Sequence, residues 1–299
     1  MTAVTQNGSR VLVIGASGLV GWHVAKRLAA GEVTVVGFRN VSAGMRSLDV
    51  REPTLVRALI TETAPSVIVL AAADPSVEGC ERDPDSTRRV NVDGVRNVVA
   101  AAAEIRSRVV YFSSDYVFDG SSQRPYAEDA ATSPINEYGR QKVEAESVVL
   151  SEPTGLVCRI SGVFGWERGR QDCRNFVCQV IQRLERGERV RAASDQTLCP
   201  TYAEDIAVAV DQLIAAGVSG VIHVVGPDAM TRAAFARLVA DAFRLSVDRV
   251  DAVATRDLGL AAARPAFSAL ATARLRSAGV RAPRSPRVAL AEMATERWL

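Results

Sequence analysis

The residues that decide the fold are Arg10–Ile14 (RVLVI) and the turn that follows at once, Gly15-Ala16-Ser17-Gly18-Leu19-Val20-Gly21. Four apolar residues after an arginine are typical of a buried strand, and the amphipathic run over 19–29 predicts a helix. In the turn between them, the first glycine permits tight bending, the second lets a pyrophosphate approach the backbone, and the third lets helix and strand pack closely. The alternative is an ordinary strand-to-helix turn. We predict a dinucleotide cofactor site with these residues: Gly15, Ser17, Gly18, Leu19, Val20 and Gly21.

Apolar runs go on alternating with amphipathic stretches along the chain. Strands are expected at 33–38, 67–70, 109–113 and 156–160, and helices at 53–63, 86–103 and 134–150. This alternation predicts an α/β fold, a doubly wound parallel sheet covered on both faces. After residue 161 the pattern loosens, with helices expected at 175–186, 202–215, 231–243 and 287–298 and a strand at 221–225. We predict a dinucleotide-binding core over 1–160, and a mixed region over 161–299 that completes the core and forms a smaller substrate-binding lobe.

Composition narrows the classes of partner. The chain has 299 residues, of which 48% are hydrophobic and 23% are charged, as in ordinary globular proteins. The net charge is +2 without a basic block, and aromatic residues make up 5%, so nucleic acid is not an expected partner. Residues 1–10 are polar, unlike a signal peptide, and Asp211 and His223 interrupt the most apolar long stretch, 207–225. We expect no membrane span and a cytoplasmic location.

The chain has five cysteines, at positions 80, 158, 173, 178 and 199. They form no Cys-x-x-Cys pair and have no Cys/His spacing suited to zinc. An odd, scattered set is typical of reduced thiols, so we expect free cysteines and no metal site.

The end of the second expected strand bears on the choice of cofactor. An acidic residue there would hold the ribose hydroxyls of NAD, but this chain has Phe38-Arg39-Asn40. A guanidinium at Arg39 is suited to the 2′-phosphate of NADP, although a solvated arginine is the alternative. NADPH is therefore the predicted cofactor, with NADH left open.

A tyrosine and a lysine are the predicted catalytic residues, together with a serine. Tyr138 and Lys142 are spaced i, i+4 on one face of the helix expected over 134–150, and Ser113 and Ser114 end the fourth expected strand. Only Lys26 and Lys142 are lysines among 36 basic residues, which favours a special role for Lys142 over a surface helix pair. A neighbouring ammonium and a positive nicotinamide would lower the tyrosine pKa. Ser114 would then hold a substrate carbonyl while Tyr138 donates a proton and the cofactor a hydride.

Motifs along nearly the whole chain carry a specific resemblance. The glycine spacing resembles the extended short-chain dehydrogenase/reductase superfamily, and Tyr111-Phe112-Ser113-Ser114-Asp115-Tyr116-Val117-Phe118-Asp119-Gly120 resembles the dTDP-4-dehydrorhamnose reductase family. Further matches are Pro125-Tyr126-x-Glu128-Asp129, Pro134, Asn136, Tyr138-Gly139, Arg159, Val163-Phe164-Gly165, Asn175-Phe176, Asp195-Gln196, Pro200-Thr201 and Arg264-Pro265-x-x-Ser268-x-Leu270. The resemblance implies reduction of a keto group, at C4, on a nucleotide-activated 6-deoxysugar by NADPH or NADH. The expected partner is a small-molecule nucleotide-sugar substrate, and a homodimer is left open.

The resemblance implies roles for particular residues. Ser114, Tyr138 and Lys142 would be catalytic, and Tyr138 and Lys142 would also contact the cofactor. The other expected cofactor residues are Asp49 and Val50 near the adenine, Ala71, Ala72 and Ala73 after the third strand, and Asn91. The expected substrate residues are Ser114, Asp115, Val117, Gly162, Asn175, Pro200 and Arg264.

Two departures from the family pattern point to a changed substrate. The family has a tryptophan that packs on the sugar where Gly162 stands, and Trp166 lies four residues further on. Leu198 and Cys199 replace small residues before Pro200. We therefore expect a sugar other than the rhamnose precursor.

Two other functions stay open. A sugar-nucleotide epimerase or dehydratase of the same superfamily would hold NAD tightly, but Arg39 and the lack of an acidic pair beside Ser114 argue against it. The regulatory subunit of methionine adenosyltransferase resembles the same family and is a binding partner, so a non-catalytic role is the second alternative.

Overall fold

The computed structural model describes residues 10–38, 44–167 and 173–296. Its centre is a seven-stranded sheet in the order β11-β6-β5-β4-β1-β2-β3, and every neighbouring pair of strands is parallel. The strands are β1 (Arg10–Ile14), β2 (Glu32–Gly37), β3 (Arg46–Ser47), β4 (Val67–Leu70), β5 (Arg108–Ser114), β6 (Leu156–Ile160) and β11 (Gly220–His223). The predicted doubly wound fold is confirmed. The strand order reverses between β1 and β4, and ligands bind at such a point in sheets of this kind.

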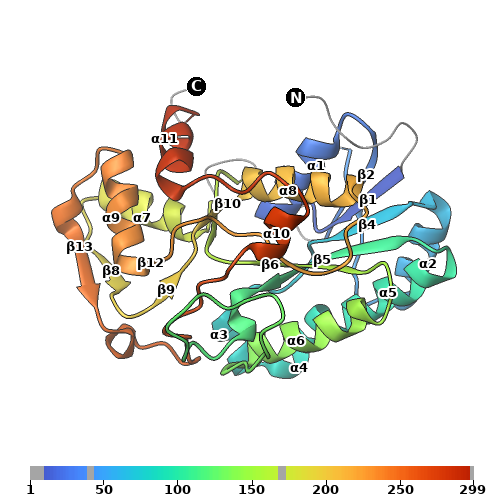
Figure 1. The fold of residues 1–299 in the computed structure, drawn as a ribbon, viewed down its shortest axis with the longest axis horizontal. Helices are drawn as coiled ribbons and strands as arrows, with labels where there is room; N and C mark the ends of the chain where they lie inside the picture. The colour runs from blue at the N-terminus through green and yellow to red at the C-terminus, as the bar shows by residue number, and fades with distance from the viewer. Residues whose placement is uncertain (1–9, 39–43, 168–172, 297–299) are drawn as a thin grey trace.

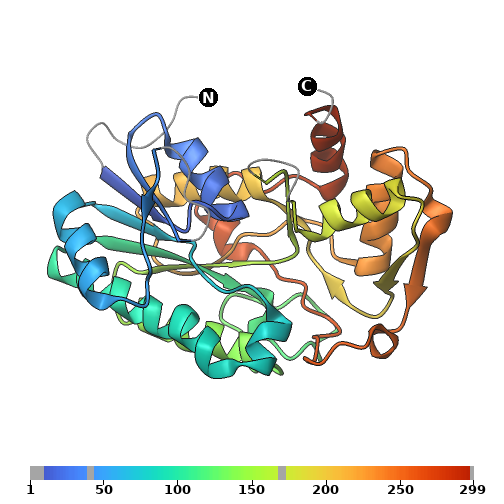
Figure 2. The ribbon, with the colours of Figure 1, turned by 180° about the vertical axis from the view of Figure 1, so that it is seen from behind.

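Helices cover both faces of the sheet (Figures 1 and 2). One layer contains α1 (Leu19–Leu28), α8 (Ala203–Ala215) and α10 (Ala273–Ser277). The other contains α2 (Pro53–Thr63), α5 (Gly94–Glu104) and α6 (Glu137–Leu150). Because side chains alternate along a strand, Val11 and Val13 pack against the first layer, and Leu12 and Ile14 against the second.

One expected helix is interrupted. In place of a single helix over 86–103, the chain runs through α3 (Val77–Arg82), α4 (Pro84–Arg88), a π-helical turn η1 (Arg89–Asp93) and then α5. Pro84 begins α4, where its missing N–H costs nothing, and Asp83 caps that helix by accepting from Ser86 N. The π turn places Asn91 and Val92 inward, since both are buried.

A lobe at one end of the core is built from residues far apart in sequence (Figure 1). Its core joins α7 (Phe176–Glu185), α9 (Arg232–Ala242) and α11 (Pro286–Glu296), with Ile181, Phe235 and Met293 among the buried side chains. Three short pairs of strands complete it: β8 (Val190–Ala193) with β13 (Val250–Val253), β7 (Val163–Phe164) with β10 (Thr201–Tyr202), and β9 (Thr197–Leu198) with β12 (Met230–Thr231). Among the described residues, 3-10 turns lie at η3 (Val247–Arg249) and η4 (Thr255–Leu258), and η2 (Asp115–Val117) directly follows β5 in the core. The division at residue 160 stays a prediction.

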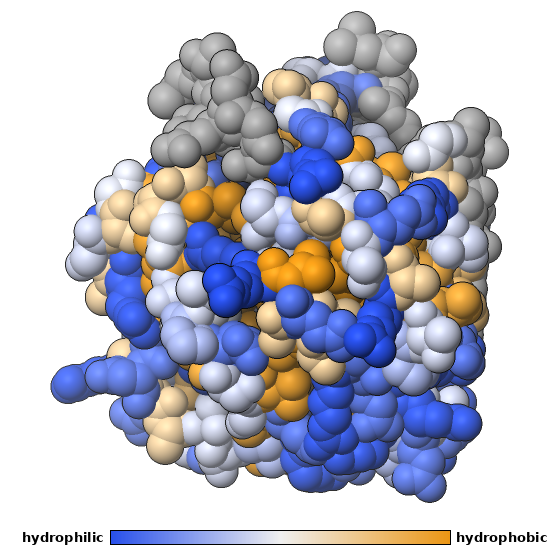
Figure 3. Space-filling view, turned by 90° about the vertical axis from the view of Figure 1, so that its right-hand side faces the viewer, coloured by the Kyte–Doolittle hydropathy of each residue, from blue (hydrophilic) through white to orange (hydrophobic). Residues whose placement is uncertain are grey.

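The end of the core opposite the lobe is mostly polar. Figure 3 shows polar side chains over this face, with apolar residues in several small groups between them. Within the described ranges, no helix combines the length and the apolar character needed to cross a membrane.

Candidate active site

A cleft lies along the carboxyl ends of β1, β4 and β5, at the point where the strand order reverses. It has two halves that share a wall of Gly18, Ala71, Ala72, Ala73 and Pro75. The β5 half, about 390 Å³, extends to the end of β5 and the first turns of α6. The β2 half, about 450 Å³, extends to the end of β2 and the segment 48–51. An extended ligand can therefore lie across both halves.

The glycine turn forms the floor between the two halves. Gly15 has φ +93°, which favours glycine, and a Cβ added there would lie 2.4 Å from Ala72 N. A Cβ on Gly21 would lie 2.2 Å from Gly15 O, so α1 can approach β1 only because Gly21 has no side chain. Gly18 caps α1 and would meet only Gly15 O, at 3.5 Å, so its free side faces the cleft. A pyrophosphate fits this cradle, because the N–H groups at the start of α1 are directed to it.

The β2 half is suited to an adenosine group. Phe38, Asp49, Val50 and Arg51 line it. Arg51 pairs with Asp49 at 2.6 Å, and its guanidinium lies 5.4 Å from the centre of the Phe38 ring. Arg51 and Phe38 are residues that sequence reasoning did not assign to the cofactor. Arg39, the predicted phosphate-binding residue, lies outside the described residues.

Asn91 lies behind the wall of the cleft. Its Oδ1 accepts from Asp74 N at 2.8 Å, and its Nδ2 donates to Asp74 O at 3.1 Å and to Gln141 Oε1 at 2.9 Å. The structure thus places Asn91 as a brace for the segment 71–74, of which Ala71–Ala73 line both halves and Asp74 lines the β2 half.

Ser114, Tyr138 and Lys142 come together in the β5 half. Ser114 ends β5, and Asn136 caps α6 by accepting from Gly139 N at 2.8 Å, which fixes the turn that carries Tyr138. The Ser114 hydroxyl accepts from Tyr116 N at 3.2 Å and lies within hydrogen-bonding reach of Tyr138. The Lys142 ammonium is 5.6 Å from the centre of the Tyr138 ring.

The protein's own groups raise the pKa of Tyr138 rather than lower it. Burial is the main cause, followed by the charge of Asp115, and the contact with Ser114 opposes both. In the protein alone desolvation dominates, whereas the expected lowering of this pKa called for the ammonium together with a bound nicotinamide. Tyr138 accordingly holds its proton near neutrality, as a proton donor must.

Lys142 is fixed by two acceptors on β5. Its ammonium donates to Tyr111 Oη and to the Phe112 carbonyl, each at 3.0 Å. Burial lowers the pKa of Lys142 to about 8, while Glu146 acts in the opposite direction. Tyr111 is 1% exposed, and the sequence contained no sign that its phenol meets Lys142.

Asp115 is a buried carboxylate in the wall of the β5 half. Its carboxylate accepts from Ser114 at 3.1 Å and from Ser161 at 2.8 Å, and also from Ser268. Burial raises the pKa of Asp115, and the serine hydrogen bonds and the charge of Arg232 oppose that rise. Asp115 therefore ties the end of β5 to the late segment that carries Ser268.

Gly162 lines the β5 half beside Leu198. Its φ is +52°, and an added Cβ would lie 2.2 Å from Leu198 Cδ1. The two departures noted in the sequence are thus coupled, because Leu198 occupies the space into which a side chain at 162 would project. Trp166 does not replace the missing ring, since it is buried in the lobe and donates Nε1–H to Met293 O at 2.9 Å.

Four predicted substrate residues do not line either half of the cleft. Val117 packs in a buried cluster with Phe118, and Pro200 is buried beneath Gly162. Asn175 caps α7 and donates to Gly165 O at 2.8 Å, and Arg264 pairs with Glu78 at 2.7 Å. In this arrangement these four residues contact the segments around the cleft and do not face its interior.

Arg232 is a lining residue that sequence reasoning missed. It begins α9 in the lobe and extends into the β5 half, donating Nε–H to Gln196 Oε1 at 3.0 Å and Nη2–H to Tyr116 Oη at 3.4 Å. Within the described ranges it has no carboxylate within ion-pair distance. Nothing in the sequence distinguished it from the many other arginines.

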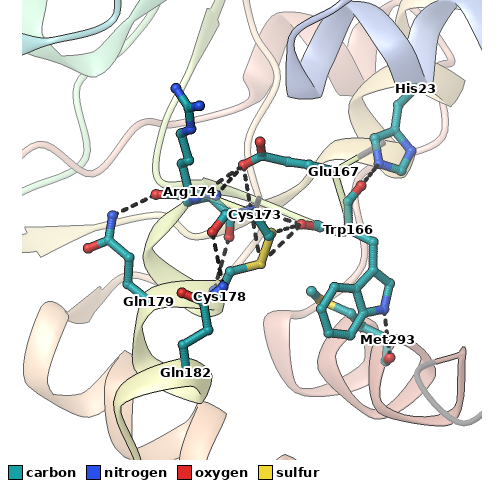
Figure 4. The surroundings of a disulfide bond; sticks show 11 residues. His23, Trp166, Glu167, Cys173, Arg174, Cys178, Gln179, Gln182 and Met293 are labelled. Atoms are coloured by element: carbon teal, nitrogen blue, oxygen red, sulfur yellow. Dashed lines mark hydrogen bonds between the residues drawn. A yellow bond between two sulfur atoms is a disulfide. The ribbon is translucent and has the colours of Figure 1, made fainter. Parts of the chain in front are cut away.

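The cysteine prediction is wrong for one pair. Cys173 and Cys178 form a disulfide with a Cα–Cα distance of 5.7 Å (Figure 4). Cys80, Cys158 and Cys199 are free and buried. Spacing alone did not reveal the pairing, which depends on the turn that enters α7.

Known proteins share these features over most of the chain. The family described as the RmlD substrate binding domain matches residues 9–298. The probable dTDP-4,6-dihydroxy-2-methyloxan-3-one 4-ketoreductase of Streptomyces antibioticus is 33% identical over 292 residues, covering 95% of this chain and 94% of that protein. Methionine adenosyltransferase 2 subunit beta of Bos taurus is 31% identical over 280 residues, covering 91% and 83%. The crystal structure of dTDP-4-dehydrorhamnose reductase from Bacillus anthracis in complex with NADP is 27% identical with a TM-score of 0.83, covering 96% of this chain and 99% of that one.

Proposed function

The chain belongs to the RmlD substrate binding domain family, as its motifs predicted, and from that premise we propose that it reduces the C4 keto group of a nucleotide-linked deoxysugar. It is an NAD(P)H-dependent oxidoreductase of nucleotide sugars, in a family that uses NADPH. The observation that carries the proposal is the β5 half of the cleft. Ser114, Tyr138 and Lys142 line this half together with residues 18–21 of the glycine turn.

The residues present fit a bound dinucleotide. Gly15, Ser17 and Gly18 would hold the pyrophosphate, Asp49 and Val50 the adenosine end, and Ala71–Ala73 the face of the nicotinamide. When bound, NADPH supplies the hydride.

The catalytic group supplies the proton and the hydrogen bonds. Ser114 turns its single hydroxyl hydrogen from Asp115 to the substrate carbonyl, and Tyr138, kept protonated by burial, gives its proton to the oxygen as negative charge develops there. The Lys142 ammonium, fixed by Tyr111 and Phe112, stabilises the phenolate that remains.

Arg232 supports a substrate that carries phosphate. Its guanidinium lines the β5 half and acts on buried Asp115 through its charge, but it forms no ion pair among the described residues, and a diphosphate is a suitable partner for such a group. The relative from Streptomyces antibioticus is named for a dTDP-linked substrate, which favours the same nucleotide here. We propose a sugar other than the rhamnose precursor, because Gly162 and Leu198 together give this wall a different shape.

We also propose a cytoplasmic homodimer. NADPH and nucleotide-linked sugars are intracellular metabolites, which supports the location, whereas the Cys173–Cys178 disulfide counts against a reducing compartment. Light scattering on the purified protein tests the dimer, and a monomer mass would exclude it.

The test is oxidation of NADPH and NADH with a panel of nucleotide-linked 4-keto sugars, comparing the wild type with Tyr138→Phe. We expect turnover with at least one sugar, a lower KM for NADPH than for NADH, and loss of at least about a hundredfold in kcat in the variant, which lacks the proton donor. Wild-type protein that consumes neither cofactor with any sugar would contradict the proposal.

A second candidate function comes from the regulatory relative. Methionine adenosyltransferase 2 subunit beta is similar over 91% of this chain, so a binding role is the alternative. Binding of cofactor without its consumption, together with copurification of a synthetase, would favour that role. Conversion of a sugar nucleotide without net cofactor oxidation would instead favour an epimerase or dehydratase.

A further inference from the structure

A second arginine from the lobe lies at the cleft, in the β2 half. Arg174 lines this half together with Ser76, Ser86 and the glycine turn. Its side chain is exposed, and among the described residues it takes part in no ion pair. The other arginine in the described part of the lining, Arg51, is already paired with Asp49.

The backbone of Arg174 is fixed on both sides. Its N–H donates to Glu167 Oε1 at 2.8 Å, and its carbonyl accepts from Gln179 Nε2 at 2.6 Å. The Cys173–Cys178 disulfide joins the residue before Arg174 to the first turn of α7. Figure 4 shows the Arg174 side chain pointing away from the disulfide. The lobe thus presents a guanidinium to the cleft from an ordered turn.

The Arg174 guanidinium contributes to the charge balance of the residues that line the β2 half. The described residues of the β2 half include two carboxylates, Asp49 and Asp74, and two guanidiniums, Arg51 and Arg174. Without Arg174 the described part of the lining would be net negative, which is unfavourable for a dinucleotide with its own negative diphosphate. Arg174 therefore restores the balance that an anionic ligand needs.

We propose that Arg174 binds a phosphate group of the dinucleotide from the lobe side, and that the Cys173–Cys178 disulfide holds the turn that presents it. The inference rests on the proposed use of a dinucleotide in this cleft. A guanidinium can give a phosphate two parallel hydrogen bonds, so the contact clamps the cofactor between core and lobe.

The test is the Kd of NADPH and of NADH, measured by calorimetry without substrate for wild type, Arg174→Ala, Arg174→Lys and the control Arg186→Ala. Arg186 is exposed at the end of α7 and does not line the cleft. We expect Arg174→Ala to raise Kd about tenfold, Arg174→Lys to recover part of the affinity, and the control to bind as wild type does.

The two cofactors distinguish the phosphates. An equal rise in Kd for NADPH and NADH identifies the diphosphate, and a rise confined to NADPH identifies the 2′-phosphate. Unchanged Kd values for both in Arg174→Ala would overturn the inference and leave the reductase intact. A wild type that binds neither dinucleotide would instead overturn the proposed function itself.

The role of the disulfide is tested with Cys173→Ser/Cys178→Ser in the same titration. We expect a several-fold rise in Kd, with no further rise when Arg174→Ala is added, because both changes remove the same contact. If the double serine variant binds as tightly as wild type, the holding role of the disulfide is wrong.

Discussion

Lys142 shows how a single residue acquires its properties from its neighbours. Burial lowers its pKa to about 8, and the Tyr111 phenol and the Phe112 carbonyl fix its ammonium at 3.0 Å each. Burial also keeps Tyr138 protonated. The pair is therefore arranged as a proton donor beside a cation that titrates near the working pH.

The Tyr111→Phe variant tests whether the phenol positions this lysine. Phenylalanine preserves the packing but removes an acceptor from a buried ammonium, so the charged form becomes less favourable. We expect kcat/KM to fall about tenfold, and its alkaline limb, which reports Lys142 in the free enzyme, to move to lower pH.

Tyr126→Phe is the matched control, because its phenol bonds Asp119 at 2.6 Å and Tyr126 does not line the cleft. An alkaline limb that stays at the same pH in Tyr111→Phe would show that Tyr111 only fills space.

At the scale of elements, the turn between β1 and α1 combines a packing constraint with a binding surface. Gly21 allows α1 to lie against Gly15, whereas Gly18 leaves room that faces the cleft. Gly21 therefore serves helix–strand packing, and Gly18 serves cofactor binding, within one motif.

Substitution by alanine separates the two effects. Gly21→Ala should lower the unfolding free energy by roughly 2 kcal/mol or more, because its Cβ meets the Gly15 carbonyl. Gly18→Ala should change it by less than about 1 kcal/mol but weaken NADPH binding, since its Cβ projects into the cleft. Chemical denaturation and cofactor titration measure the two effects. Equal losses of stability in both variants would contradict this division.

Local patterns predicted most of the core, and long-range contacts explain what they missed. The strands at 67–70 and 156–160 were predicted residue for residue, since buried parallel strands are continuous apolar runs. The short pairs β9–β12 and β8–β13 join residues that are far apart in sequence. A local hydrophobic period cannot predict such pairs.

The same reasoning applies to the site. Gly15, Tyr138 and Lys142 follow from spacing within one turn or helix. The contact of Tyr111 with Lys142 and the position of Arg232 depend on the folded sheet and lobe. Spacing could not pair Cys173 with Cys178, because a cysteine pattern does not determine its own connectivity.

At the scale of the whole molecule, a buried histidine connects the core to the lobe. His23 on α1 hydrogen-bonds through Nε2 to Trp166 O at 3.1 Å, and burial lowers the pKa of His23 to about 4. The folded state therefore holds this imidazole neutral, while the unfolded chain accepts a proton near its usual pKa of 6.5. Protonation favours unfolding, so the stability from neutral His23 is lost as pH falls from about 6.5 towards 4.

His23→Gln tests this contribution, because an amide can donate to Trp166 O but does not titrate. Between those pH values, we expect the unfolding free energy of the wild type to fall more steeply than that of the variant, by at most about 1.4 kcal/mol per pH unit. Denaturant titrations at a series of pH values measure both slopes. Parallel slopes would show that His23 does not couple stability to pH.

Hydride transfer to C4 of a nucleotide-linked sugar can be followed with an isotope label. The protein is incubated with NADPH deuterated at the transferring position and a dTDP-linked 4-keto-6-deoxysugar, and the product is analysed by mass spectrometry and NMR. We expect one deuterium, bonded to C4, and at least about a hundredfold less labelled product with Tyr138→Phe over the same period. Deuterium at another carbon, or unlabelled sugar beside unconsumed NADPH, would contradict hydride transfer to C4.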